Sequence, residues 1–338
     1  MISPSYSLTA TERVLPRLAL DFTTAILDPR VTFARSGNTA TVINSSGVIA
    51  AVNANIPRFD FDPVTLVCRG LLIEESRTNE LLNSLINGIT LVTQVVVVTA
   101  ATRTLSFYGT GQIVLSGAAS ATVTGTGAYP TRTALTFTPS AGALTLTITG
   151  TVQFAQLEIG SFATSYIPTS ATPVTRNADL ASLTGANFSS WFNISEGTII
   201  VQAEWKVPAA STQIIYEVHD GTANNRYRSL RNTTSTAFLT NATVAGTTSV
   251  SNMGTANPLM TNTVYKTANS YKTNLYRNYF TNDTALGEDT SSDVIAAPTT
   301  FQIGTNYLNA LSINGYVQKI LYWPMSFTVP EMRAFSAI

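Results

Sequence analysis

Two residue types that often act as nucleophile or general base occur once each in this sequence. They are Cys68 and His219. A Ser-His-Asp triad would have to use His219, which alternates with Val218 on a predicted strand beside a turn, a pattern typical of a surface or edge histidine. A zinc site needs several cysteine and histidine ligands. We therefore expect no zinc site, no catalytic thiol and no internal disulfide, and we interpret Cys68 as a small buried residue.

Pairs of carboxylates are the next candidates for chemistry. Glu217 and Asp220 flank a predicted hairpin turn and could approach each other as the two acids of a glycoside hydrolase. The alternative is that both are exposed turn residues. Asp60 and Asp62 alternate with phenylalanines, so an extended segment would place both carboxylates on one face. That face could hold calcium, which needs six or more oxygen ligands, or it could simply lead into a turn at Asp62.

Aromatic rings beside amide side chains are the candidates for sugar binding. Such rings combine an apolar face with a polar edge, which suits half-wet binding surfaces. Two segments in the last third of the chain have this character, and they supply the glycan-binding candidates Arg226, Tyr227, Asn306, Tyr307 and Asn309. Packing in the core or at an interface is the alternative for each aromatic residue.

The composition restricts the classes of partner. Of 338 residues, 44% are hydrophobic and only 11% are charged, so the chain can bury a core but must have a surface of hydroxyl and amide groups. Its 19 basic and 19 acidic residues balance, and no basic run occurs. Nonspecific nucleic-acid binding and attraction to an anionic membrane are therefore not expected. The N-terminus does not resemble a signal peptide, and the apolar runs are far shorter than the roughly 20 residues of a membrane span.

Alternation of apolar and polar residues predicts β-strands along most of the chain. Between residues 85 and 168, turn signals recur about every 8–12 residues, which predicts a β-sandwich or barrel. Residues 133–139 and 143–149 alternate most regularly, with Leu135 and Phe137 facing inward in the first. Earlier strands are expected at 18–22 and 31–35, with a hairpin at 40–52. The leucines at 81, 82 and 85 would allow a helical turn or two.

A second β unit is expected after residue 170. Residues 197–205 form one strand, 213–232 a hairpin that turns at Asp220-Gly221, and 313–324 a central strand with two apolar faces. Near the end, Thr328 and Glu331 have the spacing of a capping box. This spacing predicts a short helix, with Met332 and Phe335 packing on the sheet.

Three stretches resemble bacteriophage tail and appendage proteins, and they occur in the order found in that family. They are PRFDFDPVT at 57–65, GLLIEESRTNELLNS at 70–84 and FAQLEIGSFATSYIPTSATPVTRNAD at 154–179. The resemblance implies an all-β chain of tandem jelly-roll β-sandwiches after an N-terminal attachment or oligomerisation region at 1–84. Residues 85–168 would form a small sandwich like a carbohydrate-binding module. Residues 169–338 would form a concanavalin-A-like, laminin-G-type jelly roll.

The resemblance also implies partners and a possible ion. Some laminin-G-type domains bind calcium, and here the candidate ligands are Asp220, Asn224 and Asn225; no other cofactor is expected. Related proteins are often homotrimers in the virion, assembled in the host cytoplasm and released by lysis. The first region would then contact other virion proteins.

We therefore expect a non-enzymatic tail-fibre or tailspike-type subunit that binds a host-surface glycan during adsorption. One alternative is a purely structural part of the virion, such as a head decoration, collar or connector protein without glycan binding. Another alternative is a glycan depolymerase. It has less support, because Glu74 and Glu75 are adjacent and would point to opposite faces of a strand, and because no β-helix repeat occurs.

Overall fold

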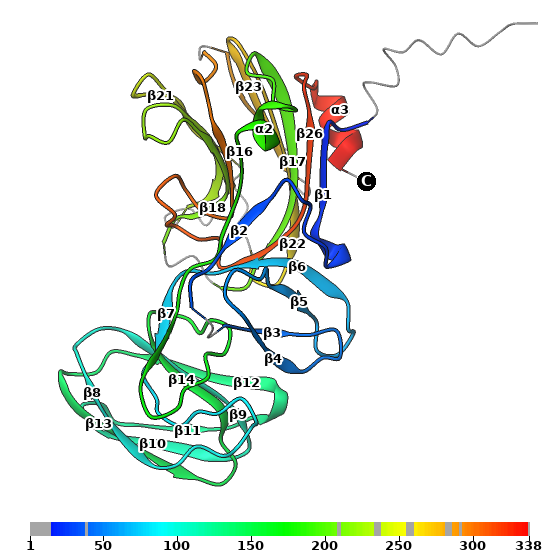
Figure 1. Cartoon of the computed structure of the whole chain (residues 1–338). Helices are drawn as coiled ribbons and strands as arrows, with labels where there is room; N and C mark the ends of the chain where they lie inside the picture. The colour runs from blue at the N-terminus through cyan, green and yellow to red at the C-terminus, as the bar shows by residue number, and fades with distance from the viewer. Residues whose placement is uncertain are drawn as a thin grey trace, which may run out of the picture. The chain divides into compact units, whose positions relative to one another are not determined.

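The computed structural model describes residues 15–37, 40–207, 211–232, 238–254, 260–280, 286–290 and 293–336 (Figure 1). Contacts between Cα atoms divide the chain into two units. We call them the middle unit, residues 34–179, and the terminal unit, residues 1–33 and 180–338. Nearly all regular structure in both is β-strand, which confirms the predicted all-β fold of jelly-roll-like sandwiches. The three-part division at residues 84 and 168 stays a prediction.

The middle unit contains a sandwich of two antiparallel sheets. The β13 sheet has the order β11-β10-β13-β8, with bounds Ala121–Thr124, Gln112–Gly117, Gly142–Thr149 and Gln94–Val98. The β9 sheet has the order β12-β9-β14, with bounds Gly127–Phe137, Arg103–Gly109 and Gln153–Ile159 (Figure 1).

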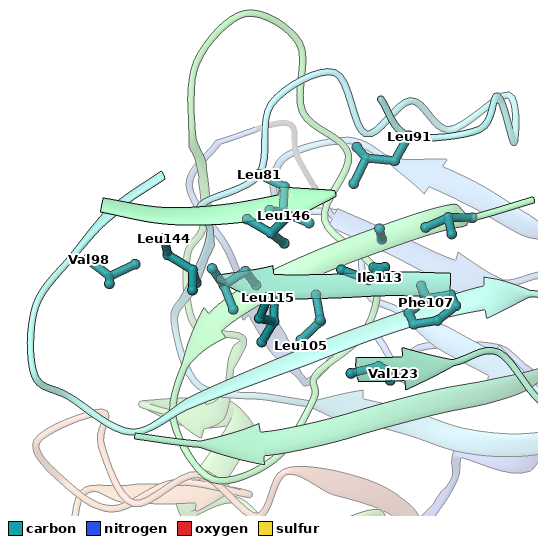
Figure 2. Packing of buried hydrophobic residues seen from close by; sticks show 13 residues of the cluster. Leu81, Leu91, Val98, Leu105, Phe107, Ile113, Leu115, Val123, Leu144 and Leu146 are labelled. Atoms are coloured by element: carbon teal, nitrogen blue, oxygen red, sulfur yellow. The ribbon is translucent and has the colours of Figure 1, made fainter. Parts of the chain in front are cut away.

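Alternate side chains of both sheets form the core between them. Figure 2 shows Leu105 and Phe107 of β9 near Leu144 and Leu146 of β13, and all four are fully buried. Leu135 and Phe137 pack against this cluster, as predicted. The period-2 pattern therefore identified the inward faces correctly.

Short strand pairs complete the middle unit. Strands β3 (Ala40–Ile43) and β4 (Ile49–Val52) form the predicted hairpin, β5 (Phe59–Phe61) pairs with β6 (Cys68–Ile73), and β7 (Arg77–Asn79) pairs with β15 (Val174–Arg176). Two local expectations differ from the structure. Cys68 is half-buried rather than buried. The helical turn near 81–85 is wrong, because this segment forms only bends after β7.

The Asp60 and Asp62 carboxylates have separate structural roles. Asp60 is 2% exposed and accepts a hydrogen bond of 2.6 Å from the Ile43 amide. Asp62 accepts hydrogen bonds from the amides of Val64 and Thr65, at 2.9 and 2.8 Å. Asp62 therefore begins a turn, as the alternative interpretation held, and the two acids do not act together as a cation site.

A buried polar cluster joins the three motif stretches inside the middle unit. Arg58, from the first stretch, donates hydrogen bonds to Glu74 of the second stretch, at 2.8 Å, and to Asp179 of the third. The Ser165 hydroxyl donates to Glu74 at 2.6 Å. Arg58, Glu74 and Asp179 are each at most 2% exposed. Burial alone would lower the pKa of Arg58, but the two carboxylates outweigh it and raise that pKa.

Two further arginines complete this cluster. Arg35 lies 3.1 Å from Asp179, and Arg176 lies 3.6 Å from Glu74 and donates to the Glu75 carbonyl at 2.7 Å. A buried charge is tolerated only when it is paired and hydrogen-bonded, and here both carboxylates are. The motifs that carry the family resemblance therefore act, in this structure, as the internal framework of the middle unit.

The terminal unit is a larger sandwich. Its β17 sheet has the order β24-β23-β22-β17-β26, and β1 also pairs with β26. Their bounds are Leu286–Asp289, Leu275–Phe280, Val264–Lys272, Glu196–Trp205, Gly315–Trp323 and, for β1, Leu18–Asp21. The 3-10 helix η1 (Phe22–Thr24) follows β1.

The facing β18 sheet has the order β2-β16-β25-β18-β19-β20-β21. The bounds are Thr32–Ala34, Leu180–Thr184, Thr300–Ile303, Gln213–His219, Arg226–Arg231, Phe238–Val244 and Thr247–Gly254. Short helix α2 spans Ala186–Ser189, and α3 spans Val329–Ser336 (Figure 1).

Aromatic rings fill the space between these two sheets. Tyr216 of β18 stacks on Phe301 of β25 with centroids 5.3 Å apart, and Tyr227 of β19 meets Tyr271 of β22 at 5.5 Å. Strand β26 lies between β17 and β1, so the predicted central strand is confirmed.

Helix α3 packs on the outward side of the β17 sheet. Phe335 lies 5.1 Å from the Trp323 ring, and Met332 is fully buried in the same cluster. The Glu331 carboxylate accepts hydrogen bonds of 2.8 Å from the amide and from the hydroxyl of Thr328. The predicted helix, its capping interaction and its packing residues are confirmed.

Candidate functional site

The hairpin between β18 and β19 contains the predicted calcium ligands. Asp220 accepts hydrogen bonds from the amide and hydroxyl of Thr222, at 2.8 and 2.6 Å, and from the Asn225 side-chain amide, at 2.8 Å. The Asn225 side-chain oxygen accepts a hydrogen bond from the Ala245 amide at 3.1 Å. Burial alone would raise the pKa of Asp220, but these hydrogen bonds outweigh it and lower that pKa. Asp220 and Asn225 do meet, but as partners within the turn. The calcium site stays a prediction that this geometry does not support.

Tyr227 cannot present its ring to a sugar in this structure. It lies on β19 rather than on a loop, and it is 2% exposed. Its ring packs between the sheets, 6.3 Å from Tyr216, 5.5 Å from Tyr271 and 5.4 Å from Tyr276. We expected this ring on a loop, but β19 begins at Arg226, and strand alternation turns Arg226 outward and Tyr227 inward. Tyr227 is therefore withdrawn as a glycan-binding candidate.

Asn306 and Asn309 shape the loop that follows β25. Asn306 is 5% exposed, and its side-chain oxygen accepts hydrogen bonds from the amides of Leu308 and Ala310. Asn309 is exposed with a φ of 58°, and its side-chain oxygen accepts from Gln302 at 3.0 Å. Asn306 is thus a buried loop residue rather than a ligand-facing one, and Asn309 is tied to the loop while remaining exposed.

Arg226 and Tyr307, which are candidates from two separate segments of the sequence, come together in the structure. The guanidinium carbon of Arg226 lies 5.6 Å from the Tyr307 ring centroid, within the range of a cation–π contact. The His219 ring lies 6.2 Å from the same ring, edge to face. Both Arg226 and Tyr307 are partly exposed. This arrangement leaves an aromatic ring and a guanidinium group on the outer side of the β18 sheet.

A buried carboxylate lies under the Tyr307 loop. Glu217 is fully buried, and one of its oxygens accepts a 3.0 Å hydrogen bond from the Tyr307 amide. Its other oxygen lies 3.8 Å from the Arg228 guanidinium group, which is 17% exposed. Arg228 in turn donates to the Asn241 side chain at 3.2 Å. The register pairs Glu217 with Arg228 and Arg228 with Asn241, so these groups form one row across β18, β19 and β20.

Several buried polar atoms around this row have no hydrogen-bond partner within the described part of the chain. They are Glu217 Oε2, His219 Nε2, Arg226 Nε and Thr243 Oγ1. His219, Arg226 and Thr243 are opposite each other in the register of β18, β19 and β20. Buried polar groups in folded proteins are rarely left unpaired. We call Glu217, His219, Arg226, Arg228, Thr243 and Tyr307 the polar site.

Burial controls the ionisation of the polar site. Burial raises the pKa of Glu217, although the Tyr307 amide and Arg228 oppose the shift. Burial lowers the pKa of His219, with Asp220 opposing, and burial also lowers the pKa of Arg228, reinforced by Arg226. The polar site therefore contains the His219 imidazole, whose neutral form is favoured, and the guanidinium groups of Arg226 and Arg228. It also contains the Glu217 carboxylate, whose charge Arg228 partly offsets.

Sequence reasoning found Arg226 and Tyr307 but missed Arg228 and Thr243. The predicted turn at Asp220-Gly221 would place Asn224 opposite Glu217. In the structure the loop spans residues 220–225, and the register places Arg228 opposite Glu217, so the sequence carried no signal for Arg228. Thr243 lies on the next strand, and nothing local in the sequence pairs it with Arg226. Glu217 was considered only with Asp220, yet the two carboxylates have separate partners in the structure.

The described residues contain no cluster of three or more His, Cys, Asp and Glu side chains that could hold a metal ion. No helix in the same part of the chain is both long and apolar enough to traverse a bilayer.

The His219 Nδ1 atom accepts a 2.9 Å hydrogen bond from the Gly221 amide, so this nitrogen is used within the turn.

Comparison with known proteins gives weak structural similarities. No family model matches the chain, and no curated protein matches it. Among solved structures it is similar to the CBM40 of a Ruminococcus gnavus IT-sialidase bound to α2,3-sialyllactose, with 10% identity, a TM-score of 0.38, and coverage of 45% of this chain and 88% of that one. It is also similar to the NanB sialidase of Streptococcus pneumoniae, with 14% identity, a TM-score of 0.35, and coverage of 46% and 26%.

A further similarity is to a SAP-like pentraxin from Limulus polyphemus. The identity is 11%, the TM-score is 0.30, and the match covers 40% of this chain and 66% of that one. Similarity at this level says nothing about the ligand of this chain. The chemistry of the polar site must therefore be argued from its own residues.

Proposed function

We propose that this chain is a glycan-binding appendage subunit of a bacteriophage virion, and that the polar site contacts the glycan. The virion assignment rests on the three motif stretches described above. The glycan assignment rests on one observation: the partly exposed Arg226–Tyr307 pair lies beside polar atoms of Glu217 and His219 that have no hydrogen-bond partner within the described residues.

The chemistry of the site suits a carbohydrate. Sugar hydroxyls both donate and accept hydrogen bonds, so one ligand can pair with the partly exposed Arg226 guanidinium group and with the Tyr307 hydroxyl. The Tyr307 ring offers an apolar face with a polar edge. A single site of this kind binds weakly, and several copies acting on one surface would raise the apparent affinity.

The test is a bacterial-glycan array probed with the full-length chain, its Arg226→Ala and Tyr307→Ala variants, and an Arg333→Ala control. Arg333 lies 5.8 Å from the Tyr279 ring, so the control removes a similar Arg–Tyr contact from the opposite sheet. We expect the two site variants to bind at least about tenfold more weakly, a loss of about 1.4 kcal/mol, with the control unchanged. A repeat with a chelator tests the calcium prediction separately.

Two other results would change the proposal. Site variants that bind as strongly as the unaltered chain would place the glycan elsewhere on the molecule. An intact, folded chain that binds no glycan at high loading would favour the purely structural virion role. Release of shorter saccharides from a bound glycan would instead favour the depolymerase.

A further inference from the structure

The outer side of the β13 sheet in the middle unit has no charged residue. Its inward side chains belong to the core of Figure 2, and alternation sends the others outward. The outward residues are mostly threonine, serine and valine: Val95, Val97, Gln112, Val114, Ser116, Thr122, Thr124, Ala143, Thr145, Thr147 and Thr149. We call this surface the uncharged face.

The absence of charge extends well beyond the face. Between Leu81 and Leu157 the sequence has only two charged residues, Arg103 and Arg132. Arg103 is 1% exposed and paired with Glu80 at 2.7 Å. Arg132 donates hydrogen bonds to the Thr164 carbonyl and the Ser106 hydroxyl, at 2.6 and 2.8 Å. Ordinary soluble surfaces carry about a quarter to a third charged residues, of both signs.

The outward side of the β9 sheet, in the same sandwich, is covered by other parts of the middle unit. Every residue of β9 is buried on both sides. On the outward side of that sheet, Glu158 accepts hydrogen bonds from Gln156 at 2.6 Å and from the Thr164 amide at 3.0 Å, within a buried network. Within the described part of the middle unit, one sheet is thus covered by the chain itself, and the uncharged face is exposed.

Strand β8 forms the edge of the β13 sheet next to this face. Val95 is 58% exposed and Val97 is 83% exposed, and Val92 just before the strand is 62% exposed. An edge strand with free backbone groups normally carries a lysine, a proline or another charge that prevents pairing with other chains. β8 has the sequence QVVVV and none of these.

We propose that a second copy of this chain covers the uncharged face and the β8 edge. A charged partner would lose hydration against a surface with no counter-ion, which costs free energy. The face matches itself instead, because threonine and serine hydroxyls donate and accept hydrogen bonds and the valines add apolar area. This inference does not depend on the glycan proposal. It assigns a surface to the homo-oligomer that the family resemblance predicts.

The experiment measures the mass of the full-length chain by light scattering over a range of micromolar concentrations. We compare the unaltered chain with Val95→Lys/Val97→Lys and Val95→Glu/Val97→Glu. Both positions are already exposed in the single chain, so neither change should alter its folding by more than about 0.5 kcal/mol. The matched control is Val64→Lys/Val67→Lys, because these valines are 76% and 62% exposed and lie outside the face.

We expect the unaltered chain and the control to be multimers. Each double variant should dissociate at least about tenfold more readily, because like charges would meet across the interface. An equimolar mixture of the lysine and glutamate variants should reassociate. A monomeric unaltered chain would overturn the proposal, and so would double variants that associate as strongly as the control. Thermal unfolding followed by circular dichroism checks that every variant is folded.

Discussion

Arg58 donates a 2.8 Å hydrogen bond to Glu74 where the two side chains are 0% and 2% exposed. The same guanidinium group also contacts Asp179, so one arginine holds segments that are 16 and 121 residues away in the sequence. Removing it would leave two buried carboxylates poorly compensated. Such a cluster is costly to break, whatever its net contribution to stability when intact.

Arg58→Met should therefore destabilise the middle unit by about 3–5 kcal/mol. Urea unfolding followed by circular dichroism measures the change. The control is Arg30→Met, whose pair with Asp28 is partly exposed, at 33% and 22%, and should contribute less than about 1 kcal/mol. A loss of under 1 kcal/mol in Arg58→Met would mean that the cluster is not a structural framework.

Gly109 should not accept a side chain. Its φ is +128°, and an added Cβ would lie 2.0 Å from the Thr151 carbonyl oxygen. Gly142 has a similar φ of +143° but no atom within 4 Å of the same position. Gly142→Ala should thus cost about 1–3 kcal/mol from backbone strain alone, and Gly109→Ala should cost clearly more. If urea unfolding gave the same loss of unfolding free energy for both variants, the close approach of the added Cβ to Thr151 would cost nothing.

The cap of α3 depends on the Glu331 carboxylate. Glu331→Ala removes the acceptor for the Thr328 amide and should cost about 0.5–2 kcal/mol. Glu331→Gln keeps an oxygen acceptor at the same place and should retain most of that stability, as capping boxes do with glutamine. Hydrogen exchange at the α3 amides compares the two variants. Identical exchange in both would contradict a capping role.

His219 should titrate below its ordinary pKa of 6.5 because it is buried. The folded state then binds a proton less readily than the unfolded state. Stability is fully present above pH 6.5 and falls as the pH drops from 6.5 through the lowered pKa. Since His219 is the only histidine, one imidazole resonance in a nuclear magnetic resonance titration reports it directly. His219→Gln should remove this part of the pH dependence, and a pKa at or above 6.5 would contradict the burial.

Regular alternation made most of the fold predictable. Strand β13 and the α3 cap follow local rules, period 2 and the Thr328–Glu331 spacing, and both are confirmed. The helical turn at 81–85 was predicted wrongly. A cluster of leucines favours a helical turn only where tertiary packing does not place those side chains elsewhere. Leu81 instead packs in the sandwich core, so tertiary packing overrode the local signal.

The polar site was only half predictable. Arg226 and Tyr307 stood out because they are adjacent to amides in the sequence, yet Tyr227 shared that context and is buried. Arg226 and Tyr227 are neighbours on β19, so their side chains point to opposite sides of the sheet, and which one faces outward depends on where the strand begins. The buried cluster could not be foreseen at all, because Arg58, Glu74 and Asp179 meet only through the tertiary fold.

The pairing of β1 with β26 has a consequence for synthesis on the ribosome. Leu18 is opposite Tyr322 in that ladder, so the sheet needs two strands that lie far apart in the sequence and are therefore synthesised at well-separated times. The middle unit is complete once Asp179 has emerged. The middle unit should therefore fold first, while β1 waits without its β26 partner until residues 315–323 have left the ribosome.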